Sequence, residues 1–344
     1  MRVAVLGAGA IGAYVGAALS RGGTEVHLIA RGANLEALRR DGVRVESPRG
    51  DFTARLNATD DPGEVGPVDY VFLGLKANSY AAAGPLVAPL LRENTAIIAA
   101  QNGIPWWYFH GLPGPYEGSR IETVDPGGAV SAALPVDRAI GCVVYCSTEL
   151  SAPGVVRHFE GTRFTLGEPA GTRSQRCTDL SEAMVAGGLK APVDEEIRND
   201  VWVKLMGNVA FNPLSALTRA TMVQICRHQG TSELVRAMMH ETLEIAHAAG
   251  ARPDISVDKR FAGAERVGEH KTSMLQDLEN GKPLELDVII SAVIEIADLT
   301  GVAAPTLRTV HAVADLLNAS VTPDEVAAAQ VRTPISPGTT SAVR

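Results

Sequence analysis

The chain has 344 residues, 46% of them hydrophobic, which suffices for about two domains with substantial cores. Its formal net charge of −8 argues against nucleic acid and anionic membrane surfaces as partners. The four cysteines lack the spacing of metal ligands, so we expect no bound metal. We expect a soluble, cytoplasmic protein, because there is no room for a signal peptide before the first strand and no apolar run reaches about 18 residues.

The N-terminal segment predicts a strand, a glycine-rich turn, a helix and a second strand. RVAVL and TEVHLIA are the two apolar runs, and both suit buried parallel strands. In the turn GAGAIG, the first glycine permits a tight bend, the second lets the backbone approach a pyrophosphate, and the third lets the helix pack on the strand. The helix N-terminus favours phosphate. We therefore expect a dinucleotide to contact Gly7, Gly9, Ala10, Ile11 and Gly12.

The end of the second strand indicates which dinucleotide binds. An acidic residue there would bond the ribose of NAD, but no acidic residue stands between the end of this strand and Glu36. Arg31 stands there instead, and its guanidinium can grip a 2′-phosphate. We expect NADP(H) to be the cofactor. The alternative is that Arg31 is an ordinary solvated surface arginine.

Two later apolar strands also end in polar residues. VDYVFLGLKAN (68–78) leads to Lys76, and TAIIAAQNG (95–103) leads to Asn102. Ligands of doubly wound sheets bind beyond the carboxyl ends of the strands. Lys76 is then placed to reach a cofactor phosphate or ribose, and Asn102 the nicotinamide ribose or the substrate. For Asn102, a plain turn is an equally good explanation.

The middle of the chain is less regular. Residues 104–138 form a long loop rich in Gly, Pro and aromatic side chains, which either lines the substrate pocket or packs on the surface. Strand character resumes in AIGCVVYCSTEL. Residues 154–168 read as a hairpin around Gly161. Residues 171–198 read as a short helix, a strand near 190–194 and a turn.

Helical spacing of apolar residues dominates after Asn199. We predict an α/β fold with a Rossmann-type dinucleotide-binding domain at 1–197 and an all-helical domain at 198–320. The remaining residues, 321–344, are polar and Pro-rich and predict a frayed tail.

An unusual polar stripe follows the predicted boundary. Lys204, Asn208 and Asn212 recur at steps of four and share one face of an otherwise apolar helix, which Pro213 should bend. A buried ammonium needs a partner, and Glu285 is a candidate carboxylate. From periodicity alone, a functional face and a lysine that reaches water beside surface amides explain the stripe equally well.

Seven motifs together resemble the ketopantoate reductase (2-dehydropantoate 2-reductase) family. In chain order they are LGAGAIGAYVGAALSRGG, LIARG, LKAN, QNG, VWVKLMGNVAFNPLSAL, TSMLQDLENGKPLELD and GVAAPT, from residue 3 to about 306. The resemblance implies a Rossmann domain and a helical domain with the site in the cleft between them.

The resemblance also implies roles for individual residues. Lys204 would protonate the ketone oxygen, and Glu285 would be a second active-site residue that also contacts the cofactor. The other implied substrate contacts are Asn208, Asn212, Ser273 and Asn102. The implied cofactor contacts include the glycine turn, Arg31, Lys76 and Asn102.

The implied activity is the NADPH-dependent reduction of a small 2-keto acid, most simply ketopantoate to (R)-pantoate in the route to pantothenate and coenzyme A. The aromatic run after Asn102 departs from the usual family pattern, so a bulkier 2-keto acid remains an alternative substrate. A second alternative is an NADP(H)-binding sensor without turnover. A homodimer is the candidate assembly.

Overall fold

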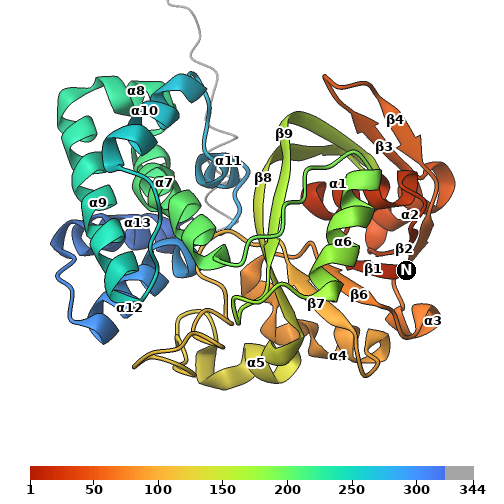
Figure 1. Ribbon diagram of the computed structural model, residues 1–344. Helices are drawn as coiled ribbons and strands as arrows, with labels where there is room; N and C mark the ends of the chain where they lie inside the picture. The colour runs from red at the N-terminus through yellow and green to blue at the C-terminus, as the bar shows by residue number, and fades with distance from the viewer. Residues whose placement is uncertain (322–344) are drawn as a thin grey trace, which may run out of the picture.

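The computed structural model describes residues 1–321, so the tail expected at 321–344 lies outside the described residues from 322 onward. The described chain forms two lobes, one built on a sheet and one built of helices (Figure 1). The predicted fold class, a Rossmann-type α/β lobe followed by a helical one, is confirmed. None of the helices in residues 1–321 is long and apolar enough to cross a membrane.

The first lobe contains a nine-stranded mixed sheet with the order β4-β3-β9-β8-β7-β6-β1-β2-β5. From β8 to β5 all neighbouring strands run parallel, so their carboxyl ends meet at one edge. The strands are β1 (Arg2–Leu6), β2 (Glu25–Ile29), β3 (Val43–Glu46), β4 (Phe52–Ala54), β5 (Asn57–Thr59), β6 (Tyr70–Leu73), β7 (Ala96–Ala99), β8 (Ala139–Ala152) and β9 (Val155–Gly167).

Short helices cover this sheet. Helix α1 follows the glycine turn, as expected, and buries Ala13, Val15 and Ala17 in the core of the lobe. The helices of this lobe are α1 (Ala10–Arg21), α2 (Gly32–Asp41), α3 (Pro62–Val65), α4 (Gly84–Val87), α5 (Ala129–Ala133) and α6 (Gln175–Ala186).

The prediction of a hairpin within residues 154–168 is wrong. That segment is one long strand, β9, which pairs antiparallel with β8, and the chain reverses before Val155. Gly161 lies inside β9 at φ +74, beside the shift in register between Tyr145 and Ser147. The turn-like Glu-Gly-Thr sequence therefore marks a bulge. The strand expected near 190–194 is present only as two isolated bridges, at Lys190 and Val193.

The second lobe is helical from Ile197 onward. Its central helix, α7, continues past Pro213 and buries most of its residues. Because the last bridge of the sheet lobe is at Val193, we propose the domain boundary just before α7. The elements of this lobe are α7 (Ile197–Thr218), α8 (Met222–Arg227), α9 (Gln229–Ala248), α10 (Val257–Val267), α11 (Ser273–Glu279), the π-helical turn η6 (Asp287–Ser291), α12 (Ala292–Thr300) and α13 (Pro305–Ser320).

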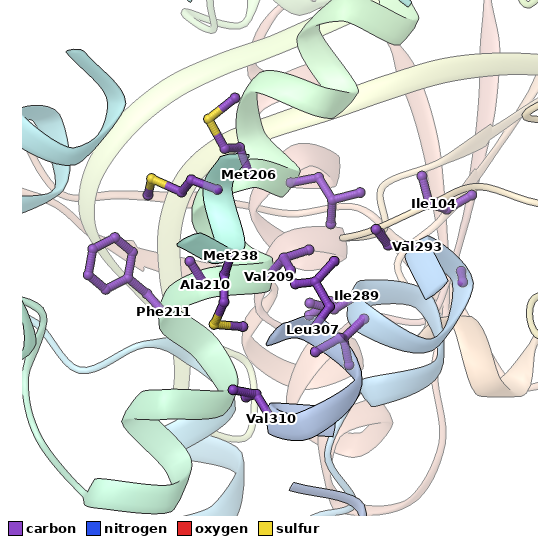
Figure 2. Packing of buried hydrophobic residues seen from close by; sticks show 14 of the residues in the cluster. Ile104, Met206, Val209, Ala210, Phe211, Met238, Ile289, Val293, Leu307 and Val310 are labelled. Atoms are coloured by element: carbon purple, nitrogen blue, oxygen red, sulfur yellow. The ribbon is translucent and has the colours of Figure 1, made fainter. Parts of the chain in front are cut away.

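The apolar core of the helical lobe also includes buried residues from the sheet lobe, Ile104 among them. Figure 2 shows Ile104, from the segment after β7, among core residues of α7, η6, α12 and α13. The Ile104 amide donates to Val288 O in η6 at 2.8 Å. The preceding Gly103 has φ +80, and a Cβ there would lie 1.9 Å from Val288 O. Only glycine fits this contact, which fixes the QNG segment against the helical lobe.

Candidate active site

The glycine turn has the geometry that its sequence predicts. Gly7 has φ +95, and a Cβ on Gly12 would lie 2.1 Å from Gly7 O. The first glycine therefore permits the bend and the third permits close packing. A Cβ on Gly9 would meet only Gly74 O, at 3.7 Å, so the space in front of it is open. Ala10 and Ile11 begin α1, as expected.

Asn34 supports this turn, and sequence reasoning missed it. Its side-chain amide donates to Ala8 O at 2.8 Å, and its side-chain oxygen accepts from Gly154 N at 2.8 Å. The glycine turn is thereby fixed to the β8–β9 turn, 120 residues away from Asn34 in the chain. Local patterning carries no signal for such a distant partner.

Arg31 and Lys76 both lie beyond carboxyl ends of strands, as predicted, but they differ in their contacts. Arg31 is exposed, follows β2 and makes no ion pair within residues 1–321. Lys76 Nζ bonds Asp277 Oδ2 of α11 at 2.6 Å, so it links the two lobes. The Asp277 partner was not foreseen.

The polar stripe of α7 faces a cavity of about 290 Å³ between the lobes. Lys204, Asn208 and Asn212 all line it, together with Ile11 of the glycine turn and Asn102. Ser273, the exposed first residue of α11, lines it as well. Elements distant in the sequence thus bring the predicted residues together. Glu285 lies outside this lining and borders a neighbouring cavity.

Lys204 contacts polar and aromatic groups of the sheet lobe. Its Nζ donates to Asn102 Oδ1 at 2.7 Å and lies 5.9 Å from the centroid of the Tyr145 ring in β8. The direct Lys204–Glu285 ion pair expected from the sequence is not formed, since among the described residues only Asn102 accepts a hydrogen bond from this ammonium.

Burial lowers the pKa of Lys204 from its ordinary 10.5 to about 8, and the Glu285 and Asp200 carboxylates oppose this shift. Burial also raises the pKa of the neighbouring thiols Cys142 and Cys146 to about 12, so both stay neutral at physiological pH. The pKa of Glu285 is raised by burial, and the Lys76 cation limits the rise. A lysine titrating near pH 8 can hold or release a proton under working conditions.

Asn212 has an unmet hydrogen-bonding requirement. It is only 4% exposed, and its Nδ2 has no partner within residues 1–321. An unsatisfied buried donor costs about 1–3 kcal/mol. Because Asn212 also lines the cavity, an acceptor on a bound molecule would remove that cost.

The aromatic loop does not line this cavity. Trp106, Trp107 and Tyr108 are buried, at 6%, 2% and 0% exposure. Trp106 Nε1 donates to Leu134 O, and Tyr108 OH accepts from Trp202 Nε1. Trp107 shares with Lys204 the lining of a separate cavity of about 20 Å³. The structure therefore favours the alternative in which the aromatic loop packs against the protein and does not line the larger cavity.

The parallel strands from β8 to β5, the glycine turn and the polar face of α7 define a Rossmann-type oxidoreductase with a helical second lobe. The chain belongs to the ketopantoate reductase family. Residues 3–106 match the family model described as Ketopantoate reductase PanE/ApbA, and residues 196–318 match Ketopantoate reductase PanE/ApbA C terminal.

Individual relatives agree with this assignment. The chain is 49% identical over 313 residues to a 2-dehydropantoate 2-reductase from Mesorhizobium japonicum, covering 91% of this chain and 96% of that one. A crystal structure of a candidate ketopantoate reductase from Ralstonia solanacearum is 37% identical, with a TM-score of 0.87 over 92% of this chain and 97% of that one. D-mandelate dehydrogenase with NADH and anilino(oxo)acetate, 21% identical, shares the fold with a TM-score of 0.78 over 93% of this chain and 99% of that one.

Proposed function

We propose that this protein reduces a 2-keto acid to a 2-hydroxy acid with NADPH, and that the substrate is 2-dehydropantoate (ketopantoate), giving (R)-pantoate. One observation carries the proposal: Lys204, whose pKa burial lowers to about 8, lines a cavity together with the glycine turn and three asparagines. The 49% identity to a 2-dehydropantoate 2-reductase over most of both chains supports the choice of substrate.

The cofactor proposal rests on the chain's own residues. The open space at Gly9 and the N-terminus of α1 suit a pyrophosphate. No acidic residue stands at the end of β2, and the exposed Arg31 there suits the 2′-phosphate that distinguishes NADPH from NADH. The bound nicotinamide supplies a hydride to the keto carbon.

The protein supplies the proton and the orientation. Lys204 donates a proton to the ketone oxygen as it becomes a hydroxyl, and its positive charge stabilises the charge that develops there. Asn102 orients the Lys204 ammonium through their 2.7 Å hydrogen bond. Asn208, Asn212 and Ser273 contact the substrate, with the unpaired Nδ2 of Asn212 as a donor.

The test is NADPH oxidation against ketopantoate, 2-ketoisovalerate, oxaloacetate and phenylpyruvate. We expect the highest kcat/KM with ketopantoate. Faster reduction of phenylpyruvate would instead favour a bulkier substrate. Binding of NADPH without turnover of any keto acid would contradict the enzymatic proposal and favour a sensor.

A further inference from the structure

A second cation lines the same cavity, and the family resemblance assigned it no role. Arg260 of α10 is partly buried and forms no ion pair in the part of the chain that the structure describes. The only hydrogen bond that its side chain makes there runs from Nε to Val203 O at 3.2 Å, so its terminal nitrogens bond no protein group within residues 1–321. Burial lowers the pKa of Arg260, yet a guanidinium stays charged in proteins.

The backbone of α7 is shaped to receive this guanidinium. A Cβ on Gly207 would lie 2.0 Å from Arg260 Nη2 and 2.6 Å from Cζ. A glycine inside a helix costs roughly 0.5–1 kcal/mol relative to alanine. Gly207 follows Lys204 by one turn and directly precedes Asn208, so Arg260 lies beside the polar stripe.

The lining of the cavity is positively charged, which favours an anionic ligand. Lys204 and Arg260 both line it, and no aspartate or glutamate among residues 1–321 does, although the whole chain carries a net charge of −8. A buried charge is stable only when it is paired, and a guanidinium fork matches a carboxylate in shape and hydrogen bonding. The cavity therefore favours an anionic ligand, with the carboxylate at Arg260.

We propose that Arg260, seated on Gly207, anchors the carboxylate of the 2-keto acid and makes the site selective for acids over their uncharged esters. This inference rests on the proposed function. It adds a charged anchor to the hydroxyl and amide contacts expected at Ser273 and the asparagines, and it leaves Lys204 to act on the ketone oxygen.

The first test compares 2-ketoisovalerate with its methyl ester. Arg260→Met should raise KM for the acid about 10- to 100-fold, the scale of a lost charge-assisted hydrogen bond, with a smaller change in kcat. Reduction of the ester and the melting temperature should hardly change. Arg260→Lys should restore part of the loss, because it keeps the charge without the fork. Arg266→Met, which removes an exposed arginine from the same helix, is the matched control.

Gly207→Ala is an independent test. Alanine favours the helix, but its Cβ displaces the guanidinium, so KM for the acid should rise while the melting temperature holds. A structural role for Arg260 would give another result: Arg260→Met would lower the melting temperature and slow acid and ester equally. That result, or an unchanged KM for the acid, would overturn the proposal.

A binding experiment separates the anchor at Arg260 from the proposed reductase activity. Calorimetry measures the binding of oxamate, a carboxylate that is not reduced, to the complex of the protein with NADPH. If the unmodified protein binds oxamate and Arg260→Met does not, the anchor stands even when no keto acid is turned over. If both bind oxamate equally, the anchor is refuted whatever the activity.

Discussion

At the scale of single residues, the proton of Lys204 controls the proposed chemistry. Its ammonium is held by Asn102 in a setting that lowers its pKa to about 8 through burial. Only the protonated form can donate a proton, so kcat should fall as the pH rises above this pKa. The same shift also affects stability, because the unfolded chain binds this proton more tightly than the folded one.

The first prediction is a pH profile. We expect kcat for keto-acid reduction to be level below about pH 8 and to fall about tenfold per pH unit above it, measured by NADPH oxidation at saturating substrate. In the folding equilibrium, the lowered pKa means that the contribution of Lys204 to stability rises with pH between about 8 and 10.5. A rate that keeps rising to pH 10 would exclude Lys204 as the proton donor.

The second residue-scale prediction concerns Arg31. Arg31→Asp should raise the dissociation constant of NADPH by at least about 10-fold, because it replaces a charge-assisted contact with repulsion, while NADH binding stays the same or improves. Fluorescence titration of both cofactors measures this. The exposed Arg39 on α2 provides the control variant Arg39→Asp. Equal affinity of the unmodified protein for both cofactors would refute the assignment of Arg31.

At the scale of elements, α7 and the segment after β7 build the site. Sequence periodicity was enough to place Lys204, Asn208 and Asn212 on one face, because helix geometry is local. It could not reveal that Gly103 packs on Val288, that Asp277 pairs with Lys76, or that Arg260 rests on Gly207, since each contact joins distant segments. The mistaken hairpin has the same cause, because the pairing of β9 with β8 made Gly161 a bulge and not a turn.

The third prediction tests the Gly103 contact. Gly103→Ala forces both a positive φ and a clash with Val288 O, so it should lower the melting temperature and also kcat, by moving Asn102 away from Lys204. Gly301→Ala is a matched control, because Gly301 has φ +72 but open space around its Cβ position. If both variants lose the same stability and neither loses activity, the contact does not position Asn102.

At the scale of the whole molecule, the site exists only where the two lobes meet. The glycine turn and Asn102 come from the sheet lobe, and Lys204 comes from the helical lobe. The Lys76–Asp277 ion pair crosses the same boundary, with side-chain exposures of 39% and 15%. A pair this exposed contributes about 0–1 kcal/mol to stability, which leaves Lys76 free to exchange Asp277 for an anionic ligand.

The fourth prediction follows from that exchange. If Lys76 contacts the cofactor, Lys76→Met should weaken NADPH binding and Asp277→Asn should strengthen it, because the competing carboxylate is removed. Binding of NADPH measured by calorimetry distinguishes the outcomes. If both variants bind NADPH with unchanged affinity, Lys76 does not contact the cofactor and only links the two lobes.

The central claim is that Lys204 protonates a keto acid reduced by NADPH, and kcat of Lys204→Met tests it most directly. Both NADPH binding and the melting temperature should be retained, since a charged lysine in a buried setting does not favour folding. We expect kcat with ketopantoate to fall roughly 10²–10⁴-fold, while the exposed-lysine variant Lys259→Met keeps full activity. Near-normal kcat in Lys204→Met, with NADPH still bound, would contradict the account.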